Sequence, residues 1–190
     1  MLKVLAKYIK EYKVASLLTI AFIIGEVVFE LLIPYMMTFI IDKGVAINDF
    51  NAVIKYGSIM IVLAVLGLIC GIAAGIYGAN ASAGFAKNLR EGMFRNIQNF
   101  SFSNIDKFSG ASLVTRLTTD ITNVQNSYQM ILRMLMRAPA TLIFALIMAV
   151  SISRDMSVIF FVAIFFLATA LAIIIAVAFK LFNQVFEKYD

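Results

Sequence analysis

The sequence predicts an all-α membrane protein with four transmembrane helices, long cytoplasmic extensions of those helices and an interfacial helix at the N-terminus. Three observations support this fold class. Of the 190 residues, 62% are hydrophobic and only 14% are charged. The apolar residues come in four long blocks, which we interpret as membrane spans. Apolar stripes at helical spacing then continue two of these blocks beyond the expected bilayer.

The first element is an amphipathic helix over residues 1–13, in which Leu2, Leu5 and Ile9 alternate with lysines. Such a helix is suited to the inner membrane interface, where lysines meet anionic headgroups. The first span covers residues 14–41. At about 1.5 Å per residue it is ~42 Å long, which exceeds a hydrocarbon core of ~30 Å.

The second span, residues 55–86, contains no charge from Tyr56 to Ala86 and carries a ridge of small residues. Small residues let helix backbones approach closely in lipid, so we expect this ridge to pack against another helix. Its members are Ala64, Gly67, Gly71, Ala74, Gly75, Gly78 and Ser82.

The third span, residues 138–153, is only ~24 Å long at the helical rise. We expect Arg133 and Arg137, which precede it, to snorkel toward the inner headgroups. The fourth span covers residues 157–179 and ends at Lys180.

A polar loop at residues 100–125 separates the second and third spans. Serines, Asn104 and Gly110 supply helix caps and breakers, which predict a turn and a short transverse helix at its tip. On both sides of the loop, apolar residues recur every three or four positions. The sequence therefore predicts a helical hairpin that projects into water and is able to pass motion to a soluble partner.

Basic residues indicate the orientation in the membrane. The first 13 residues contain four lysines and one glutamate, and residues 87–137 contain seven basic and three acidic residues. Basic residues near span ends stay on the cytoplasmic side. The N-terminus and the polar loop are therefore predicted to be cytoplasmic, and the short loops at 42–52 and 153–156 external. The net charge of +5 marks topology, not nucleic-acid binding.

Several kinds of site are excluded by composition. Cys70 is the only cysteine and the chain has no histidine, which rules out an intramolecular disulfide, a His/Cys metal site and a His-dependent triad. None of the ten glycines is followed by lysine, so the P-loop pattern G-x-x-x-x-G-K-[ST] is absent. We expect no catalytic residue, no metal site and no cofactor in this chain.

Glu26 and Glu30 are the only acidic residues inside a span. Their spacing places both on one helix face, and an ionised carboxylate at mid-bilayer costs at least ~3 kcal/mol. One hypothesis is that they face a watery pathway and favour cationic, amphipathic cargo, with the apolar neighbours Phe22, Phe29, Tyr35 and Met37. The alternative is a structural pair satisfied by Ser, Thr or Arg groups on neighbouring helices.

Two segments carry a family resemblance. The run IDKFSGASLVTRLTTDITNVQ at residues 105–125 resembles the first intracellular loop of ATP-binding cassette (ABC) exporters with a type-1 membrane domain, above all halves of bacterial heterodimeric multidrug exporters. The run LLIPYMMTFIIDKGV, from Leu31 to Val45, is similar to the first span of that family. The order of the predicted elements also fits the first four of six spans.

The resemblance implies roles for several residues. Residues 1–13 would be the elbow helix of the family, and residues 14–190 a partial transmembrane domain. The coupling helix would contact a nucleotide-binding domain, and Arg116 and Asp120 are expected to form an ion pair rather than to contact ATP. The contact residues implied are Asp106, Lys107, Phe108, Ser109 and Gly110.

We therefore expect the membrane-permease part of an ATP-driven exporter of multidrug-, lipid- or peptide-type cargo in the cell membrane. Its partner would be a second transporter half, which is non-identical in a heterodimer; a homodimer is the alternative. ATP and Mg would bind to a nucleotide-binding domain that this chain lacks, so the chain alone should neither hydrolyse ATP nor transport. A stand-alone four-helix scaffold and a small oligomeric channel lined by Glu26 and Glu30 are the alternatives.

Overall fold

The computed structural model describes residue 5 and residues 7–100, 109–152 and 154–186. These residues are almost entirely helical and contain no strand, which confirms the all-α prediction. Four helical segments are long and apolar enough to cross a membrane, which confirms the number of spans. They are Lys7–Val45, Phe50–Gln98, Gly110–Ile152 and Val158–Ile175. The chain divides into two compact units, Met1–Phe144 and Ala145–Asp190.

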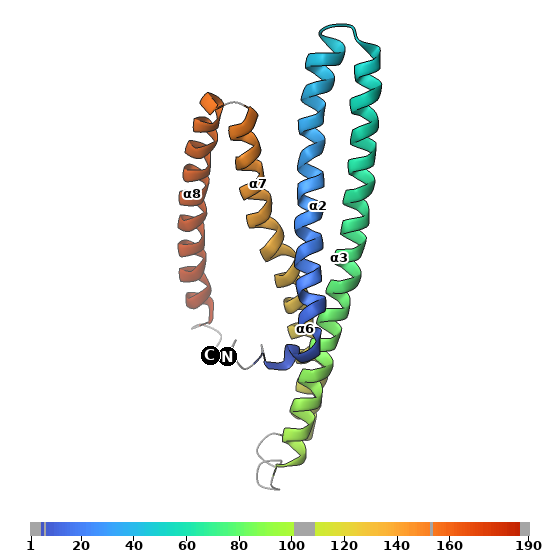
Figure 1. The fold of residues 1–190 in the computed structure, drawn as a ribbon. Coiled ribbons are helices and arrows are strands. Elements are labelled where there is room, and N and C mark those ends of the chain that lie inside the picture. Colours follow the sequence, from blue (N-terminus) through green and yellow to red (C-terminus); the bar gives the residue numbers. More distant parts are fainter. Residues whose placement is uncertain (1–4, 6, 101–108, 153, 187–190) are drawn as a thin grey trace. The chain divides into compact units, whose positions relative to one another are not determined.

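The first unit is built on two long helices that lie side by side (Figure 1). Helix α2 (Lys13–Phe39) continues into a π-helical segment, η2 (Ile40–Val45). After a short turn, α3 (Phe50–Gln98) returns alongside it. Asp49 caps α3, because its carboxylate accepts hydrogen bonds from the backbone N–H groups of Asn51 at 3.0 Å and Ala52 at 3.3 Å.

Helix α3 is much longer than a bilayer requires. Its 49 residues correspond to ~74 Å at the helical rise, against a hydrocarbon core of ~30 Å. One helix therefore contains both the second span and the apolar stripe that follows it. The cytoplasmic location of the excess length stays a prediction.

The chain then returns through a series of consecutive helical segments, two of which are π-helical. Ser109 caps the first of them, since its hydroxyl accepts a hydrogen bond from the N–H of Ser112 at 3.4 Å. The segments in order are α5 (Gly110–Thr115), η3 (Arg116–Asp120), α6 (Ile121–Met130), η4 (Ile131–Leu135) and α7 (Met136–Ile152).

The N-terminal segment differs from the predicted amphipathic α-helix. Residues 1–4 and 6 lie outside the described residues, and η1 (Lys7–Tyr12) is a 3₁₀ helix interrupted at Lys10, where φ is 39°. Its Tyr8 and Ile9 pack against the protein core. The carbonyl of Tyr8 accepts a hydrogen bond from the Asn88 side chain at 3.0 Å. An interfacial helix over residues 1–13 is thus not confirmed.

The buried core lies where α3, α6 and the N-terminal segment meet. Phe85, Ala86 and Leu89 of α3 surround Ile121 of α6. The Tyr128 ring lies 4.7 Å from the Phe85 ring, and its hydroxyl shares a 2.8 Å hydrogen bond with that of Ser16 on α2. Burial also extends along the spans, since Ile23 and Val27 of α2 and Ala74 of α3 are at most 2% exposed.

The second unit contains the end of α7 and the helix α8 (Arg154–Phe186). Its most apolar stretch, Val158–Ile175, includes the exposed side chains of Phe165, Phe166 and Leu167. Exposed apolar side chains of this kind suit contact with lipid or with further helices.

Candidate functional site

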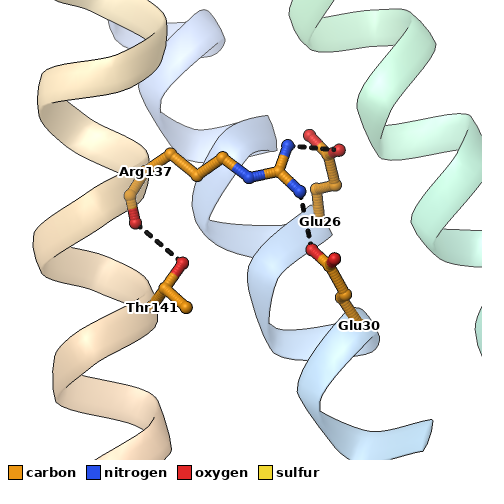
Figure 2. A network of polar contacts seen from close by, with 4 residues as sticks. All are labelled: Glu26, Glu30, Arg137 and Thr141. Atoms are coloured by element: carbon orange, nitrogen blue, oxygen red, sulfur yellow. Dashed lines mark hydrogen bonds and ion pairs between the residues drawn. The ribbon is translucent and has the colours of Figure 1, made fainter.

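A guanidinium group joins the two carboxylates of the first span (Figure 2). Arg137, in the first turn of α7, donates from one terminal nitrogen to Glu26 at 2.9 Å and from the other to Glu30 at 2.7 Å. Glu26 and Glu30 lie one turn apart on α2, and the planar fork of arginine can serve two acceptors at once. The carbonyl of Arg137 in turn accepts a hydrogen bond from Thr141 at 2.9 Å.

The three side chains differ in exposure. Glu26 is 21% exposed, Arg137 43% and Glu30 60%. The structural alternative for the two glutamates, an arginine on a neighbouring helix, is therefore what the structure contains. The expectation that Arg137 snorkels toward headgroups was wrong, because its guanidinium group turns toward α2. Two nearby carboxylates attract the cation strongly where little water screens them.

The same charged groups line a cavity of about 420 Å³. Two glutamates and two arginines contribute, so their formal charges cancel. This balance weakens the hypothesis that the site favours cations. The lining residues are Glu26, Glu30, Ile33, Leu63, Ala64, Gly67, Leu68, Gly71, Ile72, Arg133 and Arg137.

Glycines of the small-residue ridge make room for α2. A Cβ on Gly71 would lie 3.3 Å from the Glu26 carboxyl carbon, and a Cβ on Gly78 would lie 3.3 Å from the Thr19 methyl group. At Gly67 the nearest atom, the Cβ of Phe29, is 3.6 Å away, whereas nothing lies within 4 Å at Gly75. Part of the ridge thus packs against α2, and the absence of a side chain at Gly71 leaves space for the Glu26 carboxylate.

The predicted apolar neighbours of the two glutamates do not line the cavity. Phe22 stacks on Tyr77 of α3 with ring centroids 5.6 Å apart, and Tyr35 contacts Phe39 edge to face. Neither these two, nor Phe29 or Met37, is among the described residues that line the cavity. A role for them along a cargo pathway stays a prediction.

The loop residues are only partly described. Asp106, Lys107 and Phe108 lie outside the described residues, while Ser109 and Gly110 form the start of α5. Arg116 and Asp120 begin and end the π-helical segment η3, and their ion pair stays a prediction. Arg116 also lines a cavity of about 190 Å³, together with Met93, Asn96, Ile97, Phe100 and Leu113.

Comparison with known proteins identifies the family. Residues 16–190 match the family model described as the ABC transporter transmembrane region. The chain belongs to this family. The ABC transporter resemblance is thereby confirmed, and together with the four apolar helices it makes the chain a multi-pass membrane protein.

Curated relatives of this ABC transporter region are much longer. The chain is 32% identical over 183 residues to the uncharacterized ABC transporter ATP-binding protein YfiB of Bacillus subtilis (strain 168), covering 96% of this chain and 32% of YfiB. It is 29% identical over 192 residues to the uncharacterized ABC transporter ATP-binding protein Rv1273c of Mycobacterium tuberculosis (strain ATCC 25618 / H37Rv). This match covers 100% of this chain and 33% of Rv1273c. The chain spans about a third of the length of these relatives.

Arg133 and Arg137 are the site residues of this ABC transporter region that sequence reasoning missed. The sequence analysis expected both side chains to extend toward the lipid headgroups, yet both line the cavity together with the glutamates. One signal pointed to them: two carboxylates in a span need a cation, and no basic residue lies on the same span between Lys13 and Lys43. The arginines that precede the third span were the nearest source in the membrane.

Proposed function

We propose that the chain is the permease part of an ATP-driven exporter, in which closure of a nucleotide-binding domain drives alternating access. The family match over residues 16–190 carries the proposal. The relatives support it, because they are named ATP-binding proteins and are about three times as long as this chain. ATP and Mg would bind in that additional domain, and the complete protein would be an ATP-hydrolysing translocase.

Helix α3 would act as the lever. Over ~74 Å, a rotation of about 5° displaces one end relative to the other by roughly 6 Å. The core formed by Phe85, Leu89 and Ile121 joins α3 to α6 near the loop, so the two helices would move together. Motion imposed at the loop tip would in this way reach the spans.

The proposed location is the cell membrane, with the N-terminus in the cytoplasm. The excess of basic residues in residues 1–13 and 87–137 supports this orientation. We further propose a second, non-identical transporter half as partner, on the basis of the loop motif. Co-purification of two differently tagged copies from one cell would contradict the heterodimer and indicate a homodimer.

The test is transport by the product of the complete coding region, co-expressed with its partner half. Inside-out vesicles should accumulate an amphipathic fluorescent cargo with ATP but not with a non-hydrolysable analogue. A coding region that ends after Asp190 would refute the exporter. Ion conduction by the purified chain would then indicate a channel, and a stable chain without conduction would indicate a scaffold.

A further inference from the structure

Among the residues that the structure describes, the guanidinium group of Arg133 has no partner. Its side chain shares no hydrogen bond or ion pair with any of them. It lines the cavity of about 420 Å³ that contains the glutamates and also an adjoining cavity of about 410 Å³. Arg133 precedes the third span, yet it lines the same cavity as Glu26 and Glu30, which lie inside the first span, and a charge at that depth is costly enough to suggest a functional role.

Glu30 keeps acceptor capacity in the same cavity. Arg137 contacts only one of its carboxylate oxygens, and the side chain is 60% exposed. The other oxygen accepts no hydrogen bond from a described residue. Because one guanidinium group is shared between two carboxylates, Glu26 and Glu30 together retain negative charge.

The cavity thus offers a donor and an acceptor of opposite charge beside an apolar wall. Ile33 of α2 and Leu63, Leu68 and Ile72 of α3 form that wall. A ligand with a lone positive charge would meet repulsion from Arg133, and one with a lone negative charge would meet repulsion from the carboxylates. Such unfavourable pairings discriminate between ligands as effectively as the favourable ones.

We propose that this cavity binds an amphipathic zwitterion. Its ammonium group pairs with Glu30, its phosphate or carboxylate group pairs with Arg133, and its apolar tail lies along the α2 and α3 side chains. Arg137 acts as a positioning residue that holds the two glutamates. If the proposed function is correct, this ligand class is the cargo, although the binding itself requires no ATP.

Binding to the complete protein in detergent, without nucleotide, tests the proposal. Three fluorescent probes share one alkyl tail and differ in the headgroup: phosphoethanolamine, phosphate or ammonium. We expect the zwitterion to have a Kd about tenfold lower than either singly charged probe. Arg133→Gln should shift the preference to the ammonium probe, and Glu30→Gln should shift it to the phosphate probe.

Matched variants separate charge from folding. Arg133→Lys should retain most zwitterion binding, and Arg95→Gln, which removes an exposed arginine paired with Glu91 outside the cavity, should change nothing. A phosphocholine probe, which lacks N–H donors, distinguishes a hydrogen bond to Glu30 from charge attraction alone.

Equal binding of all three probes would overturn the proposal, as would an ammonium preference that Arg133→Gln leaves unchanged. The proposed function fails separately. If the complete protein selects the zwitterionic headgroup but shows no ATP-driven transport, the binding site is supported and the exporter function is rejected. If it transports with ATP but shows no headgroup selectivity, the exporter function is supported and the binding site is rejected.

Discussion

The guanidinium group of Arg137 donates a hydrogen bond to a carboxylate oxygen of Glu26 at 2.9 Å, although 111 positions separate the two residues in the chain. The contact links the first turn of α7 to the middle of α2. It also accounts for two carboxylates inside one span, because each has a cationic donor. Charge within a span persists where a partner of opposite sign compensates it.

Replacing Arg137 should destabilise the protein. Arg137→Gln leaves two carboxylates one turn apart without their cation. Removal of one partner of a buried pair costs about 3–5 kcal/mol, and the 43% exposure of Arg137 reduces our expectation to about 1–2 kcal/mol. The measurement is the thermal unfolding temperature of the purified protein in detergent.

Two further variants identify the cause. The triple variant E26Q/E30Q/R137Q should recover most of the lost stability, because no uncompensated charge remains. Arg137→Lys should recover only part, since a single ammonium group does not reproduce the fork that serves both acceptors. An Arg137→Gln protein as stable as the original would show that the ion pairs contribute nothing.

Gly84 should not tolerate a side chain. A Cβ at this position would overlap the ring of Tyr12, whereas at Gly57, in the same helix, nothing lies within 4 Å. We expect Gly84→Ala to destabilise the protein by about 1–3 kcal/mol and Gly57→Ala to stabilise it by up to ~1 kcal/mol. Unfolding temperatures of the two variants give the comparison, and equal effects would argue against packing of Tyr12 on α3.

Ile121 should contribute strongly to stability. It is 1% exposed in the core between α3 and α6, whereas Ile54 is 56% exposed. Ile121→Ala leaves a cavity and should cost about 2–5 kcal/mol, while Ile54→Ala should stay within about 0.5 kcal/mol. Protease susceptibility of the 100–125 loop should rise with the first variant only. Equal susceptibility in both would contradict a core at the loop end.

Phe108 tests the coupling proposal. If it anchors the loop on a nucleotide-binding domain, Phe108→Ala should lower ATP-dependent transport by the complete protein about tenfold, because aromatic anchors dominate interfaces. Phe165→Ala, in the exposed apolar stretch of α8, is the matched control. Unchanged transport with both variants would remove Phe108 from the coupling interface.

Local properties of the sequence were enough to predict the fold class, the number of membrane spans and the family. Hydropathy and the spacing of apolar residues depend on neighbours within a few turns, and the loop motif at residues 105–125 is contiguous. The same local properties could not predict which side chain pairs with Glu26 and Glu30. Several groups on other helices were possible partners, and the packing of segments far apart in the chain determines which of them is close enough.

The tertiary structure decided that the Arg137 side chain points toward α2. The π-helical segment η4 ends two residues before it, and each residue inserted in a helix rotates the following side chains by about 100°. The direction of the Arg137 side chain therefore depends on a local change of helix type that the spacing of apolar residues does not reveal. The N-terminal segment illustrates the same limit: its amphipathic pattern suits lipid, but Gly84 and Gly92 leave space on α3 that Tyr12 and Tyr8 occupy. The sequence by itself determined which segments are apolar helices, while the tertiary structure decided which side chains meet, because that choice depends on backbone approach between segments far apart in the chain.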